Sequence, residues 1–167
     1  DGTNNEYGLR NTNVVRIFEA LDLSDPQRQI GYYDPGLGTI GHPSMVSKIG
    51  RSVTRILGSG FGYGITANVT DAYRYLMQNW QDGDRIYIYG FSRGAYTARI
   101  IAGLINTIGL LRRDLDNLIP YALRIYRRSF KKDKARIAEN FKKTFSSSPR
   151  VHFLGLWDTV SSVGTIW

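Results

Sequence analysis

The chain has 167 residues, of which 42% are hydrophobic, 13% aromatic and 22% charged. This length and apolar content suit one domain with its own core, and they exclude a disordered tail, a collagen-like chain and a coiled coil. The absence of cysteine excludes a disulfide scaffold, cysteine-ligated zinc and a cysteine nucleophile, and two histidines are too few for an all-histidine zinc site. No apolar run approaches the roughly 20 residues that a membrane-spanning helix needs.

The net charge of +8 is concentrated in one segment. Residues 112–150 carry 12 Lys or Arg and 4 Asp or Glu, which gives 12 − 4 = +8, while the rest of the chain carries 10 basic and 10 acidic residues. The sequence therefore describes a neutral domain, residues 1–167, with a basic helical insertion at about 112–150. Such a segment suits anionic lipid head groups, nucleic acid or an acidic partner protein, or it is a solvated helical face.

Hydrophobic periodicity and turn residues predict helices that alternate with strands. The predicted helices are residues 11–21, 65–80, 95–108 and one or two basic amphipathic helices within 115–145. The predicted strands are residues 30–33, 85–89 and 151–157, and the last two are apolar enough to be buried. Asn11 or Asn13 is the expected cap of the first helix, and the alternating glycines of 58–64 suit a flexible loop or a lid. This order predicts an α/β fold with a mostly parallel sheet.

The candidate nucleophile lies in Gly90-Phe91-Ser92-Arg93-Gly94, between the predicted strand 85–89 and the predicted helix 95–108. This is the G-x-S-x-G pattern, in which the glycines relieve crowding in a sharp turn from strand to helix. The serine oxygen is then exposed at a helix N-terminus, where partial positive charge favours an oxyanion. The pattern in this context predicts that Ser92 is a nucleophile, and the alternative is a structural turn serine.

A serine nucleophile needs a base and a residue that orients the base. Asp158 directly follows the predicted strand 151–157, so it is expected at the same edge of a parallel sheet as Ser92; the alternative is a turn or capping residue. No histidine follows Asp158. His152 begins the strand, roughly 20 Å away at about 3.3 Å per residue. His42 follows the predicted strand 30–33, at the correct edge of the sheet but in the wrong chain order, and is the alternative base. We therefore expect the base to lie beyond Trp167.

An oxyanion hole needs two backbone N–H groups. One is expected from Arg93, the residue after the nucleophile, and the other from Gly2 or Thr3, in a loop whose strand would precede the chain. His42 and Arg99 are candidate substrate contacts. Gly36–Gly41 matches G-x-G-x-x-G, but His42-Pro43 follows where a dinucleotide site requires a helix, so no cofactor is expected. No metal is expected either, because the chain has no cysteine and two histidines.

Four blocks of sequence together resemble a known family. They are Asp1–Asn5 (DGTNN), Tyr32–Thr39 (YYDPGLGT), Gly90–Arg99 (GFSRGAYTAR) and Leu156–Val160 (LWDTV). The chain resembles the α/β-hydrolase domain of the first family of type VI secretion lipase effectors and of the wider uncharacterised hydrolase family around them. The resemblance implies a three-layer α/β-hydrolase-like fold, here incomplete at both ends, with Ser92 as nucleophile and Asp158 as acid, acting on phospholipid acyl esters. It also implies a late histidine, which this sequence does not contain.

The function predicted from these observations is a serine esterase or lipase domain acting on phospholipids or other esters. The resemblance implies synthesis in the cytoplasm, secretion into a target cell and a secretion or immunity partner protein; the chain shows no signal peptide, and its first residue is Asp rather than Met. The alternative is a non-catalytic hydrolase-like scaffold that binds an anionic membrane surface or an acidic partner through residues 112–150. Nucleic-acid binding ranks last, because the aromatic residues of that segment are expected to face the core.

Overall fold

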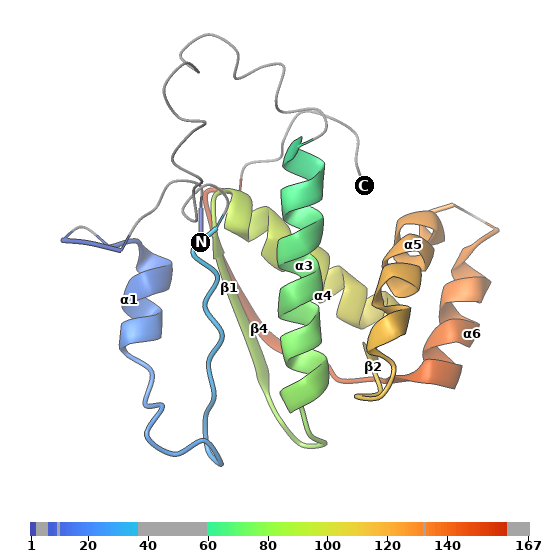
Figure 1. Ribbon diagram of the computed structural model, residues 1–167, viewed down its shortest axis with the longest axis horizontal. Coiled ribbons are helices and arrows are strands. Elements are labelled where there is room, and N and C mark those ends of the chain that lie inside the picture. The colour runs from blue at the N-terminus through green and yellow to red at the C-terminus, as the bar shows by residue number, and fades with distance from the viewer. Residues whose placement is uncertain (3–6, 10, 37–59, 132, 160–167) are drawn as a thin grey trace, which may run out of the picture. The chain divides into compact units, whose positions relative to one another are not determined.

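The computed structural model describes residues 1–2, 7–9, 11–36, 60–131 and 133–159, with the backbone alone for residues 60–63. The helices in Figure 1 are α1 (Asn13–Glu19), α3 (Gly60–Asn79), α4 (Arg93–Ile108), the 3₁₀ helix η1 (Asp116–Leu118), α5 (Ile119–Ser129) and α6 (Ala135–Phe145). The strands are β1 (Ile86–Phe91), β2 (Leu110–Leu111), β3 (Ser146–Ser147) and β4 (Val151–Trp157). Within the described ranges, no helix is long and apolar enough to cross a membrane.

Two details of the predicted helices are wrong. The cap of α1 is Thr12, whose Oγ1 accepts a hydrogen bond from the backbone N–H of Val15 at 3.3 Å, whereas the side chain of Asn11 bonds to Gly8 and Glu19 instead. Helix α3 begins at Gly60, so part of the glycine run predicted as a loop or lid is helical. The stripe of fully buried residues at Ile65, Val69 and Tyr73 explains this start, because such packing outweighs the roughly 1 kcal/mol that each glycine costs a helix.

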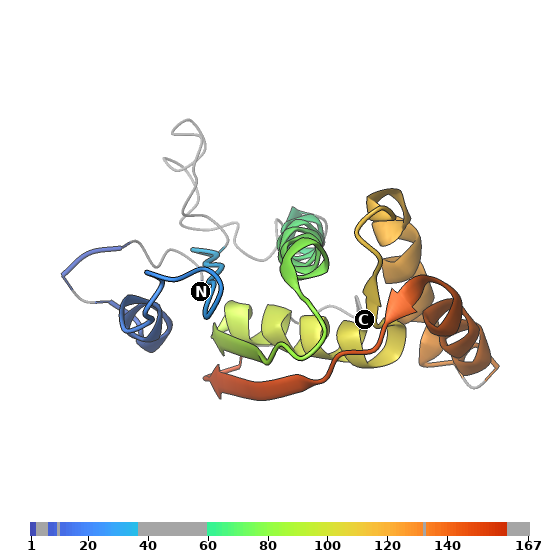
Figure 2. The ribbon, with the colours of Figure 1, turned by 90° about the horizontal axis from the view of Figure 1, so that it is seen from below.

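Strands β1 and β4 are hydrogen-bonded neighbours, and their arrows point the same way in Figure 2. The ring of Tyr87 lies 5.0 Å from that of His152, and the ring of Tyr89 lies 6.2 Å from that of Trp157. Residue numbers therefore increase in the same direction along both strands, as in a parallel pair. A short antiparallel pair joins β2 to β3. This mixture of helices and a mostly parallel sheet agrees with the predicted α/β class.

Two of the strand predictions need correction. Residues 30–33 are extended but form no strand with any described segment, and Ile30 and Tyr32 are exposed. Strand β4 forms as predicted but is not fully buried, because Phe153 is 48% exposed and Leu154 is 37% exposed. Alternation of apolar residues cannot by itself distinguish a covered strand from an uncovered one.

The chain divides into two compact units. The first takes the described residues of Asp1–Asn68, Tyr89–Thr97 and Leu156–Ile166. In it, α1 packs on the extended segment that follows it: the ring of Phe18 lies 5.5 Å from that of Tyr33 (Figure 1). This unit contains the turn after β1 and the end of β4.

The second unit takes Val69–Ile88 and Ala98–Gly155. Its core is apolar and draws on nearly every element, with fully buried side chains that include Val69, Tyr73, Leu104, Ile105, Ile108, Leu110, Leu111 and Ile119. The Tyr73 hydroxyl donates to the carbonyl of Gly109 at 2.8 Å and accepts from the N–H of Leu111 at 3.1 Å. Burial raises the pKa of Tyr73 well above its ordinary value, so this hydroxyl stays protonated.

Candidate active site

Ser92 lies in the sharp turn that joins β1 to α4, in the left-handed backbone conformation with φ = 55°. Non-glycine residues rarely adopt this conformation, and they do so most often where the surrounding structure imposes it. A Cβ atom on Gly90 would lie 2.5 Å from the carbonyl oxygen of Gly94 and 2.6 Å from the Cα of Ala95. The turn is therefore so tight that only glycine fits at Gly90, as a nucleophile elbow requires.

The end of β4 lies directly beside this turn. The backbone N–H of Ser92 donates to the carbonyl of Trp157 at 2.9 Å, and Asp158 is the next residue after Trp157. Asp158 is exposed and is also left-handed, with φ = 47°. Parallel strands end at the same edge of a sheet, so the backbones of the predicted nucleophile and the predicted acid are neighbours here.

The N-terminal segment packs against the same turn through backbone atoms. A Cβ on Gly94 would clash with the carbonyl oxygen of Asp1 and lie 2.7 Å from its carbonyl carbon. Gly36 has φ = 88°, and a Cβ there would lie 2.7 Å from the Asp1 oxygen and clash with that of Gly2. The blocks that begin at residues 1, 32, 90 and 156 thus meet around Ser92.

The Asp1 carboxylate holds this segment in place. Its Oδ2 accepts hydrogen bonds from Thr12 Oγ1 at 2.6 Å and from the Tyr33 hydroxyl at 3.0 Å, and its Oδ1 accepts one from the N–H of Gly2 at 2.6 Å. Partial burial, and to a smaller extent the charge of Asp34, raise the pKa of Tyr33, so its hydroxyl remains a donor. Hydrogen bonds to an ionised acceptor are roughly twice as strong as neutral ones.

This arrangement bears on the predicted oxyanion donors. The N–H of Gly2 is directed to the Asp1 carboxylate, which leaves Thr3, outside the described residues, as the other candidate in that loop. Arg93 is the first residue of α4, so its backbone N–H lies at the N-terminus of that helix, directly after Ser92. The Arg93 side chain is partly buried, and this burial lowers the pKa of its guanidinium.

The structure does not bring a histidine to Ser92 within the described residues. His152 is exposed near the start of β4 with its ring against Tyr87, at the far end of the strand from Asp158. It borders an open hollow of about 790 Å³ that contains neither Ser92 nor Asp158. His42 lies outside the described residues, and Arg99 is exposed in the second turn of α4.

The part of the chain that the structure describes contains no group of three or more His, Cys, Asp or Glu able to hold a metal ion. The described residues place the Ser92 hydroxyl at the N-terminus of a helix and the backbone of Asp158 at the end of the adjacent strand. This combination is typical of enzymes that transfer an acyl group through a serine.

Neither the Asp1 hydrogen bonds nor the left-handed conformation of Asp158 could be recognised from nearby residues in the sequence. The donors to Asp1 come from positions 2, 12 and 33, and Tyr33 resembled an ordinary strand residue. The one available signal was that Asp1 and Tyr33 both belong to blocks that match the family.

Comparison with known proteins identifies the class. A family model described as "T6SS, Phospholipase effector Tle1-like, catalytic domain" matches residues 1–167, so the chain belongs to this family of phospholipase effector catalytic domains. The chain is also 37% identical over 182 aligned residues to the uncharacterized protein YEL023C of Saccharomyces cerevisiae. That match covers 99% of this chain and 26% of the yeast protein, so the chain spans about a quarter of its relative. No solved structure matches the chain.

Proposed function

We propose that this chain carries the nucleophile, the acid and the oxyanion hole of a serine esterase that cleaves phospholipid acyl esters. The family, whose description names a phospholipase, supports a lipid-ester hydrolase. The observation that carries the serine mechanism is the backbone of Ser92, which has φ = 55° in a turn that only glycine at position 90 allows. The N–H of Ser92 donates to Trp157, the last residue of β4, directly before Asp158.

In the proposed reaction, Ser92 Oγ attacks the acyl carbonyl carbon while its proton passes to a histidine. The N–H of Arg93, with that of Thr3, stabilises the negative oxygen of the tetrahedral intermediate. The intermediate collapses, and the leaving lysophospholipid alcohol takes the proton from the histidine. Water then attacks the acyl-serine and gives a proton to the histidine. The second intermediate collapses to release the fatty acid, and the Ser92 oxygen takes the proton back from the histidine.

Asp158 would orient this histidine and stabilise its charged form. His152 lies near the start of β4, away from Asp158, and His42 lies outside the described residues. We propose that the base comes from sequence outside this chain. Activity should therefore be measured on the complete protein. By the same reasoning from the family description, we propose delivery into a target cell, where an immunity protein would oppose the enzyme.

The test is hydrolysis of phospholipid by the complete protein with Ser92→Ala, next to Ser148→Ala as a matched control. Ser148 is exposed and lies outside the unit that contains the turn, so its hydroxyl has no part in the proposal. We expect Ser92→Ala to lower kcat by about 10⁶ and Ser148→Ala to leave it unchanged. Normal lipid hydrolysis by the Ser92→Ala protein would contradict the proposal.

A further inference from the structure

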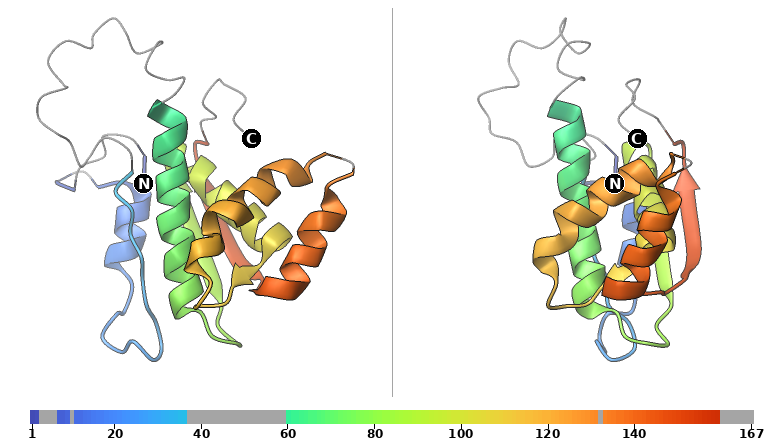
Figure 3. Two further views of the ribbon diagram at one scale, coloured as in Figure 1. Left: turned by 45° about the vertical axis from the view of Figure 1, so that its right-hand side comes forward. Right: turned by 90° about the vertical axis from the view of Figure 1, so that its right-hand side faces the viewer.

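Helices α5 and α6 form a helical hairpin, residues 119–145, and lie side by side in Figures 1 and 3. The inner faces of the two helices are used for folding. Ala122, Tyr126, Ala138 and Phe141 are buried, and the ring of Tyr121 meets that of Phe141 edge-on at 5.7 Å. Other side chains of the two helices are exposed among the described residues.

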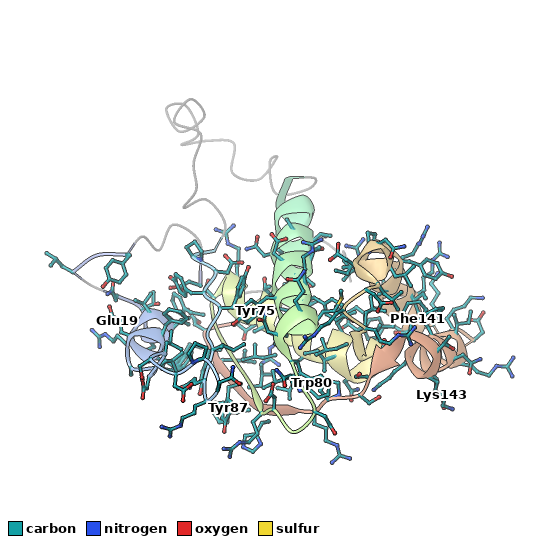
Figure 4. The ribbon with its side chains drawn as sticks, turned by 60° about the horizontal axis from the view of Figure 1, so that its bottom comes forward. Glu19, Tyr75, Trp80, Tyr87, Phe141 and Lys143 are labelled. Atoms are coloured by element: carbon teal, nitrogen blue, oxygen red, sulfur yellow. The ribbon has the colours of Figure 1, made fainter. Side chains whose placement is uncertain are left out.

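The hairpin carries most of the net charge of the chain. The hairpin contains nine Lys or Arg and two acidic residues, which gives 9 − 2 = +7 of the total of +8. Both acidic residues are engaged inside the hairpin, since Asp133 pairs with Lys134 at 3.0 Å and Glu139 with Lys143 at 2.7 Å. Figure 4 labels Lys143 and Phe141, the charged and the buried sides of α6. The exposed cations include Arg124, Arg127, Arg128, Lys131, Arg136 and Lys143.

The connection between the two helices also exposes large apolar side chains. Phe130, at the end of α5, is 67% exposed, and Ile137, in the first turn of α6, is 48% exposed. The ring of Phe130 also meets that of Tyr126 edge-on at 5.3 Å, which holds it at the end of α5. Cations with interspersed apolar anchors are typical of elements that lie on an anionic membrane surface.

The same details count against nucleic acid as the partner. Single-stranded binding surfaces rely on several exposed rings on which bases stack. Tyr126 and Phe141 are buried, and the partly buried ring of Phe145 lies 4.9 Å from that of Phe141. Tyr121 is 45% exposed, but its ring packs on Phe141 and has the guanidinium of Arg124 5.1 Å from its centre. Phe130 is thus a single anchor rather than part of a stacking platform.

We propose that the α5–α6 hairpin docks on an anionic phospholipid bilayer, with its cations on the lipid phosphates and with Phe130 and Ile137 entering the head-group region. The inference deepens the proposed function, because it supplies the surface by which an enzyme of membrane lipids would reach its substrate. The contacts it invokes nevertheless belong to the second unit alone.

The test is co-sedimentation of the complete protein with phosphatidylcholine vesicles that do or do not contain phosphatidylserine. The hairpin variant is R128E/K131E/R136E. The matched control is R16E/R28E/R85E, which reverses three exposed cations outside the hairpin and so changes the net charge equally. Each lost cation is expected to weaken binding about fivefold, so the hairpin variant should bind phosphatidylserine vesicles at least a hundredfold more weakly. The control should bind nearly as the wild type does.

Phe130→Ala tests the apolar anchor separately. It should weaken binding about tenfold without removing the salt dependence, which reflects screening lengths of about 10 Å at 0.1 M and 3 Å at 1 M salt. Equal binding by wild type and hairpin variant, equal loss in the control, or preference for DNA over vesicles would overturn the proposal. Circular dichroism of each variant establishes that it is folded.

Failure of the docking and failure of the esterase proposal give different results. Hydrolysis of a soluble short-chain ester should be unchanged in R128E/K131E/R136E, because no bilayer is involved. Ser92→Ala should abolish that hydrolysis while vesicle binding persists. Vesicle binding without Ser92-dependent hydrolysis would remove the proposed function and leave the docking surface, and the opposite pattern would remove the docking surface alone.

Discussion

Gly90→Ala tests the tight turn at Ser92. The added Cβ would lie 2.5 Å from the Gly94 carbonyl oxygen, and 2.6 and 2.7 Å from the Cα and N of Ala95. All three are backbone atoms of the turn and of the first turn of α4, so no side chain can rotate to make room. The turn itself must open, and Ser92 must move with it.

The cost follows from the steric overlap. Inserting a methyl group into a well-packed site costs about 1–3 kcal/mol, and overlap with backbone atoms on this scale places Gly90→Ala near 3 kcal/mol. For a protein of this size each kcal/mol lowers Tm by roughly 2–4 °C, so we expect a fall of about 6–12 °C. Displacement of the serine by about 1 Å should also reduce its reactivity roughly a hundredfold.

The assay compares Gly90→Ala with Gly8→Ala, where the new Cβ meets nothing within 4 Å. Thermal unfolding measures Tm, and the rate of labelling by a fluorophosphonate measures the reactivity of the serine. Gly8→Ala should change stability by less than about 0.5 kcal/mol and leave labelling unchanged. If Gly90→Ala has the same Tm as Gly8→Ala and is labelled at the wild-type rate, the turn is not as tight as described.

Three further substitutions test other parts of the structure. Tyr73→Phe should cost about 2–4 kcal/mol in urea unfolding, because the buried Gly109 carbonyl and Leu111 N–H lose their partner; a cost below 1 kcal/mol would contradict this. Asp158→Asn should lower kcat about 10⁴-fold with Tm nearly unchanged, and full activity would exclude Asp158 as the acid. Asp1→Asn should lower kcat roughly tenfold to a hundredfold at constant KM, because the loop with the second oxyanion donor is held less firmly; a change in KM alone would count against that positioning role.

The turn at Ser92 was predictable because its causes are local. Glycines at positions 90 and 94, a β-branched and aromatic run before them and an apolar helix after them all lie within a short stretch of sequence. The same holds for the α5–α6 hairpin, whose helical periodicity follows from the residues of each helix alone. In both cases the residues that cause the structure lie close together in the sequence.

What the sequence left undetermined depends on residues far apart in the chain. Residues 30–33 have the composition of a strand, yet a strand exists only where another pairs with it. The exposure of Phe153 likewise depends on which segments cover the sheet. The hydrogen bonds of Thr12 and Tyr33 to Asp1 could not be read from spacing, because carboxylate and donors meet only in the fold.

The most direct test of the central claim is the site of reaction with a fluorophosphonate, located by mass spectrometry of the complete protein. We expect one covalent adduct, on Ser92, that is absent in Ser92→Ala and kept in Ser148→Ala. An adduct on another residue, or normal phospholipid hydrolysis by a complete protein that lacks the Ser92 hydroxyl, would contradict it.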